Sequence, residues 1–210
     1  MPTITETSKI KYSRPASQER IRRVKAALET NGFKVKLVDN LDALHTAVLK
    51  QIPSGSEVFT ATSVTLDKAN LTETLNDNPY VWVRNMFMPL YGIPDKELEM
   101  KRLGSASDYA IGSVHALTED GQAVIASASG SQIPNYVYGA KNYIWVVGSQ
   151  KIVENLDEAL DRVENYSFHL EDERAKKAYG FGSSINKVLI YRKETAGRGT
   201  IYIIREAVGF

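Results

Sequence analysis

The chain has 210 residues, 43% of them hydrophobic and 24% charged, which is the composition of an ordinary globular protein with one sizeable core. Its 26 lysines and arginines against 25 acidic residues leave a net charge of +1, so no overall field attracts nucleic acid or an anionic membrane, and neither is expected as a partner. Because the sequence has no cysteine, disulfides, thiolate metal sites and iron–sulfur clusters held by this chain itself are excluded.

The N-terminal residues are polar, and residues 1–16 are expected to form an irregular arm ahead of a single α/β domain over residues 17–210. They contain no apolar core of signal-peptide length. No later segment approaches the roughly 20 apolar residues that span a bilayer. The sequence therefore predicts a soluble protein of the cytoplasm.

Two helices and two strands alternate after this arm. Ser17 predicts the N-cap of a helix that ends at Gly32, and its apolar residues recur at helical spacing: Ile21, Val24 and Leu28. A strand over 33–39, a helix over 41–52 and a short strand over 57–61 follow. This alternation predicts a parallel sheet covered by helices on both faces, with ligands beyond the carboxyl ends of its strands.

A loop rich in hydroxyl groups follows the second of these strands. It contains Thr60, Thr62, Ser63 and Thr65 and leads into a helical segment. Free N–H groups at a helix start, joined by hydroxyls, suit a phosphate or a carboxylate. Plain helix capping is the commoner role of such residues, and both interpretations stay open.

The middle of the chain opens with an aromatic and methionine-rich segment over 80–95, which is expected to cover the core or to form an oligomer surface. Asp95 is expected to cap a short helix that ends at Gly104. A strand over 108–112 comes next. The turn Thr-Glu-Asp-Gly at 118–121 then joins strands over 114–117 and 123–126 into a hairpin.

A second hydroxyl-rich loop follows the hairpin and is the better predicted anion site. Backbone N–H groups and hydroxyls are expected to bind the anion, because the loop leads into a segment that can begin a helix: Ser127, Ser129, Gly130, Ser131 and Gln132. Lys141, Lys151 and Arg198 are expected to add positive charge. The glycines match neither a dinucleotide nor a nucleoside triphosphate motif. His45 and His169 have no metal-ligand spacing, so no metal site is predicted.

The C-terminal part predicts three strands and a long helix. Residues 143–147 form an apolar strand, and Asn155 opens a helix that either continues or breaks near Tyr166. Its charged second half is expected to be a solvated face or a subunit contact. Two closing strands then flank a Gly-Arg-Gly turn at 197–199.

Several of these segments together resemble the LUD domain, the lactate-utilisation family of LutC and YkgG type. The resemblance extends over most of the chain and is carried by TATSVTL at 60–66, SVHALTEDG at 113–121, ASASGSQ at 126–132, and VG at 147–148 followed by KIV at 151–153. It implies the α/β fold shared by glucosamine-phosphate deaminase, ribose-phosphate isomerase and the coenzyme A transferases (NagB/RpiA/CoA transferase-like). That fold has a mostly parallel sheet with helices on both faces, here with an antiparallel hairpin.

The same resemblance implies a role in oxidising lactate to pyruvate. Since this chain has no cysteine, the iron–sulfur clusters of such a system would belong to partner proteins. A small-molecule anion is the expected ligand, with coenzyme A or a phosphorylated compound as candidates. A homo-oligomer is a further expectation.

The resemblance implies a catalytic role for Glu119. Asp120 beside it is expected to bind the ligand. In the resembling coenzyme A transferases, a glutamate in a glycine-bearing turn attacks an acyl group and forms a thioester. A solvated glutamate in a hairpin turn is the competing interpretation. His115 lies in the same hairpin within reach of Glu119, but a histidine on an apolar strand is more often a hydrogen-bonded core residue.

Three functions therefore stay open. The first is a LUD-type protein that binds a small carboxylate or a phosphorylated ligand and serves organic-acid use together with partners. The second is a non-catalytic interaction scaffold that docks through residues 80–91. The third is a coenzyme A transferase or isomerase that acts alone through Glu119.

Overall fold

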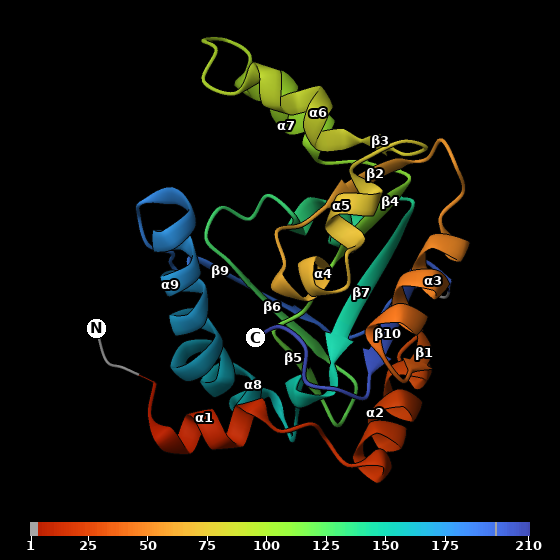
Figure 1. Ribbon diagram of the computed structural model, residues 1–210, viewed down its shortest axis with the longest axis vertical. Coiled ribbons are helices and arrows are strands. Elements are labelled where there is room, and N and C mark those ends of the chain that lie inside the picture. The colour runs from red at the N-terminus through yellow and green to blue at the C-terminus, as the bar shows by residue number, and fades with distance from the viewer. Residues whose placement is uncertain (1–3, 196) are drawn as a thin grey trace.

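The computed structural model describes residues 4–195 and 197–210, and its centre is a parallel β-sheet (Figure 1). Within those residues the sheet has six strands, all paired in parallel, in the order β1-β10-β7-β4-β2-β3. The strands are β1 (Lys34–Val38), β10 (Gly199–Ile204), β7 (Asn142–Gly148), β4 (Tyr109–Gly112), β2 (Glu57–Thr60) and β3 (Val81–Trp82). Parallel pairing places the carboxyl ends of all these strands at one edge, where the following loops gather.

A second, smaller sheet packs beside the first. It has the order β8-β5-β6-β9, with β8 (Ile152–Val153), β5 (Ala116–Thr118), β6 (Ala123–Ser127) and β9 (Lys187–Tyr191). Strands β5 and β6 form the predicted antiparallel hairpin, and β8 pairs with β5 in parallel. The two predicted closing strands, β9 and β10, both form but belong to different sheets.

Helices surround the two sheets. They are α1 (Glu6–Ser13), α2 (Gln18–Thr30), α3 (Leu41–Gln51), α4 (Val64–Lys68), α5 (Leu71–Leu75), α6 (Val83–Phe87), α7 (Glu97–Gly104), α8 (Leu156–Arg162) and α9 (Phe168–Tyr179). Shorter 3-10 turns are η1 (Met88–Leu90) and η3 (Ser149–Lys151), and π-helical turns are η2 (Asn135–Gly139) and η4 (Val163–Ser167). Since η4 joins α8 to α9 without a break, the predicted long helix continues past Tyr166.

Strand β7 shows how the core is divided, because it is buried on both faces. Its residues Ile144 and Val146 pack with α3, α4 and α5. Trp145 and its neighbours on the opposite face pack with α2 and the second sheet. An apolar central strand with two covered faces is the expected pattern of a parallel sheet. The α/β fold class predicted from the sequence is therefore confirmed, with the second sheet supplying part of the cover on one face.

Two local predictions from the first half of the chain are wrong. Residues expected to be irregular form α1, whose Thr5 N-caps the helix and whose Tyr12 is buried against α8 and η4; residues 1–3 of the predicted arm lie outside the described part. Asp95 does not cap the helix that ends at Gly104, because the N-cap is Lys96 and Asp95 itself has a left-handed backbone with φ of 65°.

The aromatic segment covers the core only in part: Val83 is buried in the core, and Tyr80 and Phe87 pack against it. Helices α6 and α7 project from the rest of the molecule (Figure 1). Large apolar side chains on this projection are exposed, among them Met86, Met88, Tyr91 and Leu98. In the described part of the chain, no helix is both long enough and apolar enough to cross a bilayer.

Candidate functional site

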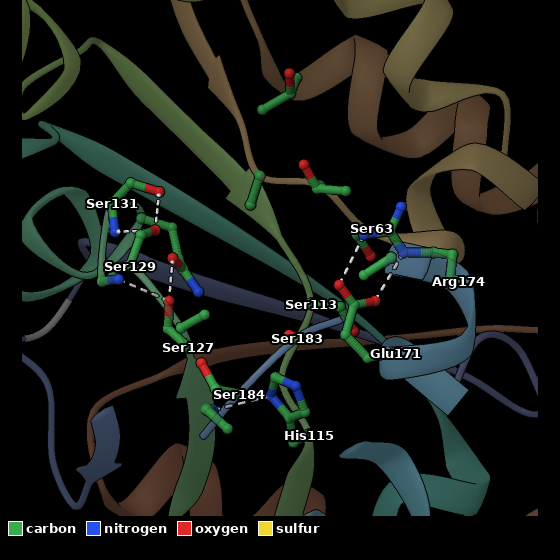
Figure 2. Close-up of a pocket in the computed structure, with 18 of the residues that line it drawn as sticks. Ser63, Ser113, His115, Ser127, Ser129, Ser131, Glu171, Arg174, Ser183 and Ser184 are labelled. Carbon is green, nitrogen blue, oxygen red and sulfur yellow. Dashed lines mark hydrogen bonds and ion pairs between the residues drawn. The ribbon is translucent and has the colours of Figure 1, made fainter. Parts of the chain in front are cut away.

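The two hydroxyl-rich loops line one cavity of about 770 Å³ (Figure 2). The first loop follows β2 and the second follows β6, so segments more than 60 residues apart in sequence meet there. The cavity is bounded further by the α6–α7 projection, by α9 and by the segment after α9. Predicted site residues that line it are Thr60, Thr62, Ser63, Thr65, His115, Ser127, Ser129, Gly130, Ser131, Gln132 and Lys151.

Lys151 lies at the floor of the cavity, in η3 directly after the central strand β7. The residue is 2% exposed. Its Nζ lies 3.0 Å from Ser113 Oγ, 3.2 Å from the Val114 carbonyl oxygen and 3.4 Å from Thr65 Oγ1. The amine thus joins the loops that follow β2, β4 and β7, and burial lowers its pKa well below the ordinary value.

Arg162, at the end of α8, is a second basic group beneath the same floor. Its side chain is fully buried between the rings of Tyr12 and Tyr166, and Nη1 donates to the His115 carbonyl at 2.6 Å. Nε and Nη2 have no hydrogen-bond partner in the described part of the chain. Burial lowers the pKa of Arg162 to about 10, so the guanidinium remains charged at neutral pH.

Neither of these buried basic groups has a carboxylate partner among the described residues. Lys151 and Arg162 instead bind the carbonyl oxygens of consecutive residues, Val114 and His115. An unpaired buried guanidinium is costly, and its field acts through a medium of low dielectric constant. The charged Arg162 guanidinium therefore makes the floor of the cavity electropositive, with no counter-charge beside it among the described residues.

His115 presents a neutral ring to the cavity. Its Nδ1 accepts a hydrogen bond from the Ala126 backbone N–H at 3.1 Å, so the ring proton lies on Nε2. Burial, together with the nearby Lys151 and Arg162, lowers the pKa of His115 to about 3. This arrangement fixes the tautomer and leaves Nε2–H available as a donor to a ligand.

The hydroxyl groups of the first loop have two roles: some are hydrogen-bonded within the fold, and others face the cavity. Thr60 Oγ1 is used by the fold, since it donates to Asn76 Oδ1 and accepts from Trp82 Nε1, both at 2.9 Å. Ser63 occupies the N-cap of α4, yet its side chain makes no capping hydrogen bond. Its hydroxyl lies at the cavity (Figure 2), so the plain-capping interpretation does not account for it.

The second loop differs from its prediction in one respect. Two of its backbone N–H groups are already occupied: Gly130 N–H donates to Ser127 Oγ at 2.9 Å, and Ser131 N–H donates to Ser129 Oγ at 3.3 Å. Ser127 Oγ in turn donates to Gln132 Oε1 at 3.0 Å. The loop is thus held by its own serines, and those N–H groups are not presented to a ligand.

Glu119 and Asp120 do not line the cavity. Glu119 forms ion pairs with two arginines of α2, at 2.5 Å to Arg20 Nε and 3.3 Å to Arg23 Nη2. Asp120 accepts hydrogen bonds from Thr118 Oγ1 and from Gln122 Nε2. The acidic turn therefore docks the hairpin onto α2, and the structure does not bring its carboxylates to the two loops.

The glycine of that turn explains why the docking is tight. Gly121 has φ of 84°, and a Cβ built there would lie 2.7 Å from the Ala27 carbonyl carbon. Asn31 Nδ2, at the end of α2, donates to the carbonyl oxygens of Asp120 and Gly121 at 3.1 and 2.9 Å. The contact with α2 accounts for the Thr-Glu-Asp-Gly sequence without a catalytic role.

Arg198 is likewise outside the cavity. Its guanidinium donates to the carbonyl oxygens of Asn135, Tyr136 and Ala140 at the end of η2, and it pairs with Glu194 at 2.9 Å. The Asn135 carbonyl also accepts the Ala140 N–H, so Arg198 adds to the hydrogen bonds of this turn. Arg198 therefore caps a helical turn and supplies no charge to a ligand.

Sequence reasoning missed several residues of the site. Ser113, directly after β4, lines the cavity and lies 3.0 Å from Lys151 Nζ. Helix α9 contributes a bidentate pair in which Arg174 donates to Glu171 at 2.7 Å through both Nε and Nη2 (Figure 2). The hydroxyl of Tyr136, which also lines the cavity, is buried without a partner among the described atoms. Ser113 was recoverable from its place at the end of a parallel strand.

The charges along the cavity wall are mostly basic. Of the charged residues that line it within the described part, four are basic and one is acidic: Arg84, Lys101, Lys151, Arg174 and Glu171. Arg174 neutralises the one acid. Residues 4–195 and 197–210 contain no group of three or more histidines and acids that could hold a metal ion. The wall is suited to an organic anion by its charge and its hydroxyls.

Comparisons with known proteins address the fold and the family. A sequence model of the LUD domain matches residues 21–204. The structure is similar to the crystal structure of a DUF162 family protein from Deinococcus radiodurans at 1.70 Å resolution, with a TM-score of 0.52 and 13% sequence identity, over 90% of this chain and 99% of that chain. At that identity the likeness concerns the fold alone. No curated protein sequence matches this chain.

Proposed function

We propose a function for this chain from one premise: it belongs to the LUD domain family. The proposal is that the chain binds a small organic anion, a carboxylate or a phosphorylated compound, in the cavity between its two hydroxyl-rich loops. The family's link to lactate makes lactate and related organic acids the first ligands to test. Iron–sulfur proteins that oxidise such acids are the proposed partners, since this chain has no cysteine of its own.

The basic lining of the cavity is the observation that carries this proposal. Four basic side chains and one acidic side chain line a hollow of about 770 Å³. Arg174 pairs with Glu171, Lys101 pairs with Glu97, and burial lowers the pKa of Lys151, so the positive charge comes from Arg84 and from the charged Arg162 beneath the floor. Water-filled hollows of this kind favour negative charge because field lines concentrate between walls of low dielectric constant. The Nε2–H of His115 and the hydroxyls of Ser63 and Ser113 would supply directed hydrogen bonds to an anion's oxygen atoms.

Ligand-induced thermal stabilisation tests the proposal. Lactate, pyruvate, a sugar phosphate and an acyl-coenzyme A would each be titrated against the wild type, Lys151→Met and the control Lys141→Met, whose lysine is exposed and outside the cavity. A ligand present at about 100 times its Kd stabilises the folded chain by about 2.7 kcal/mol. For a chain of this size that corresponds to roughly 5–10 °C in Tm.

The expected result is stabilisation of the wild type and of Lys141→Met by at least one class of anion, and a weaker response of Lys151→Met. If no class of anion raises the Tm of the wild type, the proposal fails. Stabilisation that is equal in wild type and Lys151→Met would place the anion elsewhere.

Catalysis through Glu119 has little support, because both carboxylate oxygens are engaged by arginines of α2. An acyl transfer that begins at this residue would first have to break the contact between hairpin and helix. Glu119→Gln is therefore proposed to leave ligand binding unchanged.

A second candidate function is docking to a protein partner through the α6–α7 projection. The observation that favours it is the exposure of Tyr91 at 73% and Leu98 at 59% on this projection. Clusters of exposed apolar side chains commonly mark protein interfaces. Light scattering coupled to size exclusion would test it, and a monomer that stays monomeric with the proposed partner proteins would exclude this surface.

A further inference from the structure

The amine of Lys151 is a nucleophile that the proposed binding function leaves unused. Its Nζ is buried with three oxygen neighbours, and no carboxylate of the described chain pairs with it. A fixed cation, Arg162, lies on the neighbouring peptide carbonyl. Burial and a nearby cation are the two conditions that keep a lysine amine unprotonated and reactive at neutral pH.

We infer that Lys151 forms an imine with the carbonyl carbon of a 2-oxo acid bound in the cavity. The inference rests on the proposed function, since it specifies which organic anions that cavity takes. The basic wall selects the carboxylate group, and the amine selects a ligand that also carries a ketone next to it. A hydroxy acid of the same length satisfies only the first requirement.

The step balances within the groups that line the cavity. The Nζ lone pair attacks the carbonyl carbon, a C–N bond forms, and the C=O π electrons move to oxygen. Nitrogen gives up a proton through Ser113 Oγ, 3.0 Å away, and the new alkoxide takes one to give a carbinolamine. The nitrogen lone pair then expels the hydroxyl group, which takes up a proton and leaves as water, and the nitrogen loses its remaining hydrogen. An amine and a ketone thus give an imine and water with no oxidant or reductant.

His115 is placed to help the oxygen leave. Its Nδ1 is held by the Ala126 N–H at 3.1 Å, so its Nε2–H is the donor that remains for the carbonyl oxygen or the carboxylate. His115 and Ser113 act on Lys151 and its ligand from the same strand-to-strand connection, between β4 and β5.

Reductive trapping tests the inference on the full chain. The wild type would be incubated with pyruvate, 2-oxobutyrate or phenylpyruvate in the presence of cyanoborohydride, which reduces an imine to a stable secondary amine. The expected product is one adduct per chain, whose mass increase equals the acid minus water plus two hydrogens, and which peptide mapping assigns to Lys151. Lactate is the matched control, because it lacks the ketone and should give no adduct.

The dependence of trapping on pH separates Lys151 from surface lysines. At pH values below its ordinary pKa, an exposed lysine becomes about 10-fold more reactive for each unit by which the pH is raised, because its unprotonated fraction rises by that factor. The rate for the buried amine, whose pKa burial lowers, should instead depend less steeply on pH over the same range. Lys151→Arg keeps a basic group and should lose the adduct, whereas Lys141→Met should keep it.

The outcomes separate this inference from the proposed function. Binding of 2-oxo acids by thermal stabilisation, with no adduct or with adducts spread over exposed lysines, overturns the inference and leaves the proposed function intact. Absence of both binding and adduct overturns both. If Lys151→Arg does not fold, mapping of the wild-type adduct decides the matter alone, since an adduct on any residue other than Lys151 contradicts the inference.

Discussion

Replacing Lys151 with methionine should change how the stability of the protein depends on pH. In the unfolded chain the lysine is protonated up to about its ordinary pKa of 10.5, whereas burial holds the folded-state pKa well below that value. At pH values between these two pKa values, the unfolded state binds one more proton than the folded state. The contribution of Lys151 to stability therefore rises with pH in this window and is lost as pH falls toward the folded-state pKa.

The magnitude follows from proton linkage alone. A difference of one bound proton changes the free energy of unfolding by about 1.4 kcal/mol per pH unit. Between the folded-state pKa and the ordinary value, the stability of the wild type relative to Lys151→Met should thus increase by about 1.4 kcal/mol for each unit by which the pH rises. Methionine has a similar length and no titrating group, so it removes the linkage while it fills most of the space.

Urea denaturation followed by circular dichroism at several pH values would measure this difference. The exposed Lys141 provides the control, and Lys141→Met should run parallel to the wild type over the same range. Parallel curves for the wild type and Lys151→Met would show that Lys151 is charged in the folded protein. That result would refute the reasoning that burial without a counter-ion neutralises the amine.

Three further predictions concern the hairpin and the histidine. Gly121→Ala should reduce the free energy of unfolding by about 3 kcal/mol or more, since the left-handed backbone and a clash with the Ala27 backbone combine. The control Gly55→Ala, with φ of 80° and no atom within 4 Å of the new Cβ, should reduce it by only about 1–2 kcal/mol. Equal losses of stability in urea denaturation would contradict the docking of the hairpin on α2. Glu119→Gln should reduce stability by about 1 kcal/mol or less without altering ligand-induced stabilisation, and a loss of ligand response would restore Glu119 to the site. His115, with its pKa near 3, should show no change in its ring NMR shifts as pH falls from about 8 to 5, because the folded protein takes up no proton there; a midpoint near the ordinary value of 6.5 would contradict its burial.

Much of the fold could be predicted from the local sequence, because capping residues, apolar spacing and turn residues constrain the backbone directly. Ser17 accepts the Arg20 N–H as an N-cap, and Ile21, Val24 and Leu28 on the following helix are all buried. The turn at 118–121 sits between two antiparallel strands. In each case the residue type fixes the backbone in the same way before and after tertiary packing.

The position of the site is only partly readable. Parallel strands place their carboxyl ends at one edge, so a loop after β2 was a sound expectation. That the loop after β6 reaches the same cavity depends on how the second sheet packs on the first, which no local pattern encodes. Lys151 was predicted to add positive charge at the ligand, and its burial, which follows from being the third residue after a central strand, was not predicted.

The role of Glu119 could not be read from its own turn. Its partner Arg20 lies 99 positions away, and nothing in the hairpin specifies that α2 will pack beside it. The segment over 80–95 left two interpretations open for a related reason: its apolar composition fits a core cover and an exposed interface equally well. An apolar composition indicates that side chains are favoured away from water, but it does not specify whether the surface that buries them belongs to the same chain or to another molecule.

A crystal structure of the protein grown with a 2-oxo acid or with lactate tests the central claim most directly. The account predicts electron density for the ligand between the loop over 60–65 and the loop over 127–132, with its carboxylate facing His115 and Ser113 above Lys151. Ligand density at the tip of the hairpin, beside Glu119 and Asp120, with the cavity holding only water, would contradict it.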